Sequence, residues 1–260
     1  SAPNFYITGN PSQTSSTTRN LERAAGTVTA VNPYSGNTEV VSNFLADQAE
    51  MGLLHMITAD PKRDPTFTMF AKPDYFLSTF PPTTAINPAF NWNHGDIAPE
   101  INTTWLGLVG PDVKNMGATG DLWTDHADIR PTVLALAGLH DDYIHEGRPI
   151  SQVMTETRQD LNQLADVYKQ INAPVGQLSL DSIAFATKAT LSNSTGDQTY
   201  IDADAQIAAW ASQRDALAAQ MIALLDTTAP GASTQHNDRN VNDLITQGEQ
   251  LLAEVHAAAA

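Results

Sequence analysis

The sequence contains no cysteine. Disulfides and thiolate metal sites are therefore excluded, and any bound metal must be held by histidine and carboxylate side chains. A cysteine-free, acidic chain rich in threonine, asparagine and alanine is typical of exported bacterial proteins, so we expect a secreted or cell-surface location. The lack of cysteine by itself fits a cytoplasmic protein equally well.

Positively charged residues are scarce. Lys and Arg number 13 against 29 Asp and Glu, which gives a formal net charge of −16 at pH 7. A field of this sign repels phosphate backbones and anionic lipid headgroups, so nucleic acid is not an expected partner. A small anionic substrate is still compatible with the charge, because a bound divalent metal reverses the local sign of the potential.

Long apolar runs are also absent. No stretch approaches the roughly 20 apolar residues that span a bilayer, and neither a Gly-rich phosphate loop nor an internal repeat occurs. The hydrophobic share of 42% is that of a folded globular protein. Ser1–Pro3 lacks the basic start and apolar stretch of a signal peptide and leads directly into the strand-like Asn4–Thr8. We therefore expect the chain to be a portion of a longer protein.

Residues 1–150 alternate short apolar runs with helical stretches and Pro/Gly turns, which is the pattern of an α/β domain. A helix is predicted over Val41–Met51. The predicted strands are Phe5–Thr8, Leu53–Thr58, Thr66–Ala71 and Trp105–Val109. Because Leu53–Thr58 is apolar nearly throughout, it favours a strand covered on both faces, as in a mostly parallel sheet sandwiched by helices.

Residues 151–260 predict an α-helical extension of about four helices packed as a bundle. Apolar residues recur there every three or four positions. The three resulting stripes are Val153, Leu161, Leu164, Tyr168 and Ile171; Ile207, Trp210, Leu217, Met221 and Leu224; and Leu244, Ile245, Leu251, Leu252 and Val255. We expect this extension to serve packing, oligomerisation or surface assembly and to supply no catalytic group.

Three motifs follow one another in the second half of the 1–150 segment. They are Asn93-His94-Gly95-Asp96, the run Thr103–Val109 with Gly110-Pro111, and Asp128-Ile129-Arg130-Pro131-Thr132. In this order they resemble the C-terminal core of the alkaline phosphatase superfamily, in particular large secreted bacterial phosphodiesterase-like members. In that family a late His-Gly supplies a metal-ligating histidine, a strand ending in Gly-Pro-Gly follows, and a helix opens with an Asp-Ile-x-Pro-Thr-like sequence.

The resemblance implies a metal-dependent phosphoesterase acting on a small phosphomonoester or phosphodiester. Residues 1–150 would then be the C-terminal part of its α/β domain, and His94 would ligate one of two divalent ions, with zinc the expected metal. No catalytic residue is expected in this chain, because the nucleophile and most metal ligands would lie upstream of Ser1, in the N-terminal remainder of the same protein. A catalytically inactive surface or structural protein and a sulfatase-like hydrolase are alternative readings.

Further polar residues near these motifs carry weaker predictions. Asp96, Asp125 and His126 are candidates for hydrogen bonds to the metal ligands without contact to the metal itself. For Asp125 and His126 the reason is chain order: the Asp-His metal pair of the family precedes the late His-Gly, whereas these two residues follow it. Asp128 is predicted to cap a helix over residues 128–137 that Gly138 stops. The acidic stretch His140–Pro149 is predicted to be a solvated loop with Arg148 as its anchor.

Overall fold

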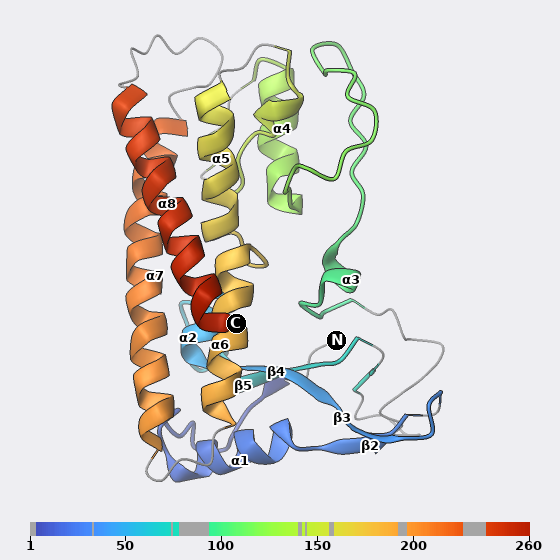
Figure 1. Cartoon of the computed structure of the whole chain (residues 1–260), viewed down its shortest axis with the longest axis vertical. Coiled ribbons are helices and arrows are strands. Elements are labelled where there is room, and N and C mark those ends of the chain that lie inside the picture. Colours follow the sequence, from blue (N-terminus) through green and yellow to red (C-terminus); the bar gives the residue numbers. More distant parts are fainter. Residues whose placement is uncertain are drawn as a thin grey trace. The chain divides into compact units, whose positions relative to one another are not determined.

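The computed structural model describes residues 4–32, 34–73, 75–77, 94–139, 142, 143, 145–155, 159–191, 197–225 and 238–260 (Figure 1). The chain divides by its contacts into two compact units. The first comprises Ser1–Trp105, Leu180–Ala209 and Ala258–Ala260, and the second comprises Leu106–Ser179 and Trp210–Ala257. This division does not follow sequence order, and the expected domain boundary near residue 150 stays a prediction. No described helix is both long and apolar enough to cross a membrane.

The first unit contains two small antiparallel sheets. One has three strands in the order β1 (Asn4–Phe5), β5 (Phe67–Ala71) and β4 (Ser42–Ala46). The other is a hairpin of β2 (Thr29–Val31) and β3 (Thr38–Val40). Asn32 O accepts from Gly36 N at 2.8 Å in its turn, where Gly36 has a φ of +71° that glycine adopts readily.

The expected mostly parallel sheet sandwiched by helices is wrong, because both sheets of the described residues are antiparallel. Leu53–Thr58 is no strand; Leu53 ends helix α2 (Gln48–Leu53), and turns follow it. The segment predicted as one helix over Val41–Met51 is instead strand β4 followed by α2. Trp105–Val109 has no regular structure. The strand predicted at Thr66–Ala71 is confirmed as β5.

Capping explains where α2 begins. Asp47 accepts from Ala49 N at 3.2 Å, while Glu50 accepts from Asp47 N at 2.9 Å, which completes a capping box. These two reciprocal bonds satisfy backbone donors that a helix start leaves free. The capping box therefore fixes the start of α2 at Gln48, and of the strand expected over Leu53–Thr58 the helix includes only Leu53.

Helix α1 (Ser16–Gly26) packs against β4 and β5. It begins after Ser15, whose hydroxyl accepts from Thr18 N at 3.2 Å. Ala25 of α1 belongs to the apolar core of this layer, in which Phe5 stacks on Phe67 with ring centroids 4.4 Å apart. The core of this layer consists of Ala25, Leu45, Phe67 and Met69, with Phe5, Ile7, Leu77 and Leu191 against it.

The second unit is built on helices. It contains α5 (Gln159–Asn172), most of α8 (Asp238–Ala259) and the C-terminal part of α7 (Gln198–Leu225), while α6 (Gln177–Thr190) begins in it. The predicted stripes are largely buried: Leu161, Leu164, Tyr168 and Ile171 on α5; Trp210, Leu217 and Met221 on α7; and Leu244, Ile245, Leu251 and Val255 on α8. A Cβ added at Gly248 would lie 2.3 Å from Val167 Cγ1, so α8 approaches α5 closely at that glycine.

Helix α4 (Ile129–Leu136) follows the 3₁₀ turn η2 (His126–Asp128). Pro131 lies in its first turn, and Gly138 ends it with a φ of +64° while Leu139 N donates to Leu134 O at 2.9 Å. The helix predicted over 128–137 is therefore confirmed to within a residue at each end. Asn93, His140, Asp141 and Ile144, which belong to the motifs above, lie outside the described residues.

The buried Gly147 packs directly on the backbone at the start of η2. A Cβ there would lie 2.2 Å from Ala127 C and O. Because neither backbone can move without displacing its neighbours, we expect Gly147→Ala to lower the free energy of unfolding by about 3 kcal/mol, at the upper end of typical overpacking penalties. Gly120→Ala is the matched control, because no atom lies within 4 Å of its added Cβ. Urea unfolding of both variants gives the comparison, and equal midpoints would contradict the close approach.

Candidate functional site

His94, the candidate metal ligand, lies on the surface of the first unit. Its side chain is exposed, and the adjacent Gly95 has a φ of +88°. That left-handed conformation favours glycine and turns the chain sharply between His94 and Asp96. The imidazole is therefore presented at a tight turn, ahead of the short helix α3 (Pro99–Asn102).

Asp96 stabilises the turn that carries His94. Its carboxylate accepts from Ala98 N at 2.7 Å, and Asn102 Nδ2 donates to the Asp96 carbonyl at 2.5 Å. Partial burial raises the pKa of Asp96 above its usual value, although the Ala98 N–H acts in the opposite direction. Asp96 thus positions the loop. A hydrogen bond from Asp96 to a metal-ligating residue stays a prediction.

Asp125 and His126 lie in the second unit at the start of η2. Asp125 accepts from Ala127 N at 2.6 Å, and Asp128 accepts from Asp125 N at 3.1 Å, so the two carboxylates form a capping box. Burial, followed by the charge of Asp128, raises the pKa of Asp125. His126 is exposed. The structure gives Asp125 a capping role. The predicted hydrogen bond from Asp125 or His126 to a metal-ligating residue stays a prediction.

Asp128 is the centre of a buried polar network. Its carboxylate accepts from Arg148 N at 2.8 Å and lies 3.4 Å from Lys169 Nζ on α5, and both ionic side chains are almost fully buried. Thr132 Oγ1 donates to the Asp128 carbonyl at 2.6 Å and accepts from Ile150 N at 2.9 Å. Asp128 therefore lies at the helix start, where the cap was predicted. It also connects the start of α4 to residues 148–150 and to α5.

Arg148 anchors the loop before η3 (Ser151–Val153), as predicted. Its guanidinium donates to His145 O at 2.5 Å and to Gly147 O at 2.8 Å. It also lies 5.2 Å from the ring centroid of Tyr168, whose hydroxyl donates to Glu146 O at 2.7 Å. These contacts fix the loop on α5.

A second buried charged cluster lies in the first unit, and sequence reasoning did not identify it. Arg19 and Glu22 of α1 form a buried ion pair. Arg19 also donates to Thr190 O at 2.8 Å and stacks on the Tyr200 ring at 3.7 Å from its centroid. At its rim Arg23 pairs with Asp197, which lies 3.7 Å from Arg19 Nε.

The capping box of α2 extends this cluster. Tyr200 donates its hydroxyl hydrogen bond to Asp47, and the carboxyl groups of Asp47 and Glu50 interact directly. Burial, then the Asp47 charge, raises the pKa of Glu50 well above its usual value. The same two causes raise the pKa of Glu22 to about 7, although Arg19 acts in the opposite direction.

Charge balance determines what the cluster can do. Three buried carboxyl groups, those of Glu22, Asp47 and Glu50, stand against the buried guanidinium of Arg19. Full ionisation would leave excess negative charge in a medium of low dielectric, so the cluster retains protons near neutral pH. Since all these side chains are buried, we interpret the cluster as a proton-holding structural network.

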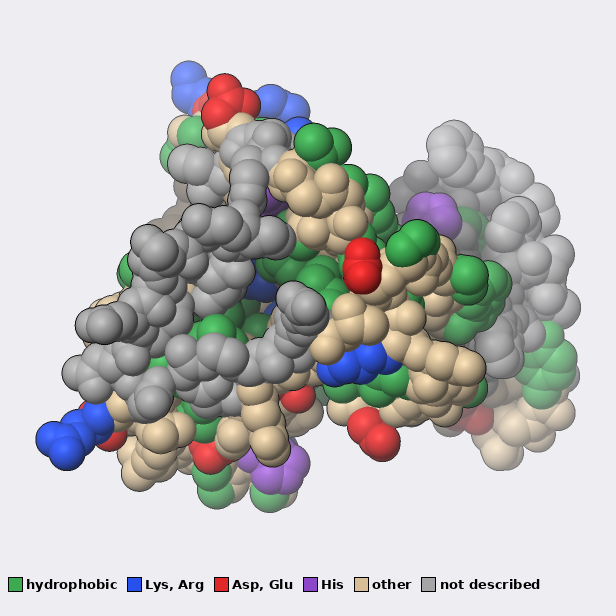
Figure 2. All heavy atoms as spheres, turned by 90° about the horizontal axis from the view of Figure 1, so that it is seen from above, with side chains coloured by type: hydrophobic (Ala, Val, Ile, Leu, Met, Phe, Trp, Pro, Cys, Tyr) green, Lys and Arg blue, Asp and Glu red, His purple; other side chains and the backbone are tan. Residues whose placement is uncertain are grey.

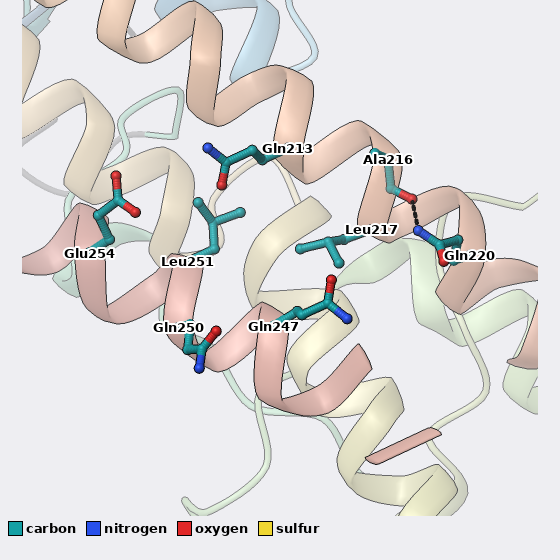
Figure 3. Close-up of a pocket in the computed structure, with 8 residues that line it drawn as sticks. All are labelled: Gln213, Ala216, Leu217, Gln220, Gln247, Gln250, Leu251 and Glu254. Carbon is teal, nitrogen blue, oxygen red and sulfur yellow. Dashed lines mark hydrogen bonds between the residues drawn. The ribbon is translucent and has the colours of Figure 1, made fainter. Parts of the chain in front are cut away.

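A shallow groove runs between α7 and α8 in the second unit (Figure 3). Its volume is about 310 Å³, and it is lined by Gln213, Ala216, Leu217, Gln220, Gln247, Gln250, Leu251 and Glu254. Gln220 donates to Ala216 O at 3.1 Å on its own helix. Glu254 accepts from the indole of Trp210 at 2.8 Å, so the only carboxylate of this lining already has a structural partner. Amide side chains of this kind carry no acid or base chemistry at neutral pH.

The predicted site residues are not gathered at one place within either unit. His94 and Asp96 belong to the first unit, whereas Asp125 and His126 belong to the second. In the part of the chain that the structure describes, no three His, Asp or Glu side chains converge as a metal site would require. One sequence signal for the missed cluster did exist, because Asp47-x-x-Glu50 is a capping-box pattern.

Comparison with protein-family models, curated proteins and solved structures yields no match for the chain. The likeness to the alkaline phosphatase superfamily therefore depends on the three sequence motifs alone.

Glu22 is expected to make the stability of the protein dependent on pH. Burial raises the pKa of Glu22 in the folded state from its ordinary 4.5 to about 7, so the folded state binds more protons and loses stability as pH rises from about 4.5 to about 7. At roughly 1.4 kcal/mol per pKa unit, the loss from this residue is about 3 kcal/mol. Glu22→Gln should reduce the difference in unfolding free energy between pH 5 and pH 8 by about this amount, and the contribution of Glu50 remains. Urea unfolding at both values tests this, and an unchanged difference would contradict it.

Lys169 is expected to be essential for the stability of the second unit. Lys169→Met would leave the buried Asp128 carboxylate without its cation, which lowers the free energy of unfolding by about 3 to 5 kcal/mol. Adding Asp128→Asn should recover part of the loss, because the uncompensated charge is then removed. Lys188→Met, at an exposed position on α6, serves as the control with an effect within about 1 kcal/mol. Equal effects of the two Lys→Met changes in thermal unfolding would argue against the ion pair.

Proposed function

We propose that this chain is the C-terminal part of a metal-dependent phosphoesterase that hydrolyses small phosphomonoesters or phosphodiesters. The nucleophile and most metal ligands would be supplied by polypeptide outside this chain, in an N-terminal remainder of the same protein. The expected setting is secreted or on the cell surface. The proposal does not include the parallel sheet, which the described strands contradict.

The observation that carries the proposal is the ordered set of three motifs around His94, Gly110-Pro111 and Asp128. Two structural details support it. His94 is exposed beside the left-handed Gly95, where a ligand can approach. Asp112, which follows Gly110-Pro111, has a φ of +63°, a conformation that glycine prefers and that the Gly-Pro-Gly of the resembled family would adopt without strain.

The chain offers one ligand that suits a divalent metal site, the imidazole of His94. An exposed imidazole is a good ligand for zinc, and His94 is the residue that would hold it. One imidazole does not bind zinc tightly by itself, because protein sites use three or more ligands. When bound, a pair of divalent ions stabilises negative charge on the attacking and leaving oxygens of a phosphoryl transfer.

The residues of this chain have positioning roles in the proposal. His94 would present one ring nitrogen, and Asp96 holds the turn through Ala98 N. Asp128 and Arg148 fix the start of α4 and its neighbouring loop in the second unit. With a net charge of −16, the chain repels an anionic substrate, so positive charge at the site must come largely from the metals.

A second candidate is a catalytically inactive surface or assembly protein. Its support is the use of perturbed carboxylates as structural groups: Asp125 in a helix cap, and Glu22 and Glu50 in a buried network. A sulfatase-like hydrolase would use a similar metal chemistry and differs in its nucleophile. Turnover of phosphate and sulfate esters by the intact protein separates the three functions.

His94→Ala in the intact protein is expected to reduce both bound metal and phosphoesterase turnover at least about tenfold, since removal of an imidazole ligand weakens the site. Its stability should change by less than about 0.5 kcal/mol, because an exposed side chain contributes little to the core. His256→Ala, an exposed histidine of α8, is the matched control and should change neither property. Metal content by elemental analysis and hydrolysis of a nitrophenyl phosphodiester give the two measurements. Unchanged metal content in His94→Ala would remove His94 from the site.

A further inference from the structure

The start of helix α7 presents a mixed polar and apolar face to the first unit. Residues of this helix up to Ala209 belong to that unit. Tyr200, Ala203 and Ile207 are buried, Asp204 is partly buried, and the four recur at the spacing of one helix face. Because two of them carry a hydroxyl or a carboxyl group, the attachment of this end depends on the partners of those groups.

The partners of this face come from α1 and from the start of α2. The Tyr200 hydroxyl donates to the Asp47 carboxylate, and the centroid of its ring lies 3.7 Å from Arg19 Cζ. Directly before the helix, Asp197 pairs with Arg23 of α1. The start of α7 is therefore held through the same charged groups that form the buried cluster of the first unit.

This cluster contains more acidic groups than basic ones. Figure 2 shows Asp and Glu side chains at separate places on the molecular surface, whereas Glu22, Asp47 and Glu50 are gathered in the interior. The titratable and charged side chains that meet there are Arg19, Glu22 and Arg23 on α1, Asp47 and Glu50 at the start of α2, and Asp197, Tyr200 and Asp204 at the start of α7. Carboxyl groups outnumber guanidinium groups, so bound protons offset the excess charge.

Glu22 loses its proton in the neutral range. Its Oε1 is buried and has no hydrogen-bond partner among the described residues. An ionised carboxylate at that position lacks the donors that water would supply. Burial, followed by the charge of Asp47, raises the pKa of Glu22 to about 7. Above that pH, an opening that admits water to Glu22 becomes more favourable, because water then solvates the charged group.

The elements around the cluster differ in what else holds them in place. Helices α1 and α2 both pack against β4 and β5, and Met51 and Leu53 of α2 are almost fully buried. The buried side chains of α7 in this unit are Tyr200, Ala203 and Ile207, and Tyr200 is itself a member of the cluster. Segments with few buried apolar side chains open at the lowest free energy, so the start of α7 is the segment expected to separate first.

We propose that the protonated acid cluster of Glu22, Asp47 and Glu50 holds residues 198–209 of α7 against α1 and α2, and that deprotonation of Glu22 releases this segment while α1, α2 and the sheet stay folded. The proposal goes beyond the phosphoesterase function and does not depend on it. The released fraction increases as pH rises through neutrality and decreases again when the proton is restored. The start of α7 is then a pH-responsive element of the first unit.

Thiol labelling tests the release, because the chain contains no cysteine of its own. Ala203→Cys places a thiol on the buried face of α7, and Ala205→Cys places one on its exposed face as the reference for the pH dependence of the thiol itself. A pyridyl disulfide reagent labels both variants at pH 5 and pH 8. The rate for Ala203→Cys divided by that for Ala205→Cys should rise on the order of 70-fold between these values, since opening returns the pKa of Glu22 from about 7 to its ordinary 4.5.

Two further variants separate release of α7 from unfolding of the unit. Ala71→Cys places a thiol in the buried strand β5, and at pH 8 it should be labelled at least about 100-fold more slowly than Ala203→Cys, because β5 stays folded. Glu22→Gln combined with Ala203→Cys should lower the rise at least about tenfold, because glutamine has no proton to lose. Equal rates for Ala71→Cys and Ala203→Cys, or an equal rise with and without Glu22→Gln, overturn the proposal.

A pair of Tyr→Phe variants tests the contact itself and does not require that Glu22→Gln folds. Tyr200→Phe removes the hydroxyl that donates to Asp47, so it should raise the labelling rate of Ala203→Cys at pH 5 at least about fivefold. Tyr75→Phe is the matched control, because the Tyr75 hydroxyl donates to Glu39, outside the cluster, and the change should leave the rate within about twofold. Circular dichroism shows that each variant is folded. Equal labelling rates in the two folded variants overturn the attachment of α7 through Asp47.

Discussion

The buried carboxylate of Asp128 is the constraint on which the arrangement of the second unit depends. It receives the N–H of Arg148, the N–H of Asp125 and the charge of Lys169, so one side chain connects a helix start, a loop and a second helix. Such a group is stable only while each partner is present, because an unpaired buried charge is strongly destabilising. The close packing of Gly147 on Ala127 follows from the same connection, since it brings the two backbones together.

The first unit also buries charged groups, but its cluster contains more carboxyl groups than cations. Arg19 compensates only part of the negative charge of Glu22, Asp47 and Glu50, and the remaining balance is met by protonation. The stability of this unit therefore depends on pH in the neutral range, while the Asp128 network has a cation for its buried anion. Perturbed carboxylates are often taken as signs of catalysis, but Glu22, Glu50 and Asp125 each participate in a helix cap or an ion pair. The surroundings of these three residues favour structural roles over acid-base chemistry.

Local signals in the sequence were informative where structure is determined locally. The apolar stripes of α5, α7 and α8, the helix from Ile129 to Leu136 and its end at Gly138 follow from periodicity and capping. Strand pairing was not predictable in this way, because it depends on contacts between distant residues, and the order β1, β5, β4 brings Asn4 beside Thr68. Burial of Arg19 and Lys169 was likewise invisible, since neither position differs in sequence from an ordinary surface cation. Of the candidate site, the anchoring role of Arg148 matched expectation, while metal ligation by His94 stays a prediction.

The mistaken sheet and the irregular segment Trp105–Val109 have one physical origin. A strand gains stability only from a neighbouring edge and from cover on its faces, so an apolar extended sequence specifies a strand without specifying where its partner lies. Thr66–Ala71 contains such a sequence and forms β5 because β1 and β4 flank it. Trp105–Val109 has a comparable apolar character, yet no described strand lies along it, and it remains irregular and exposed. An apolar pattern therefore indicates strand propensity alone, and the strand predicted at Trp105–Val109 does not form within the described chain.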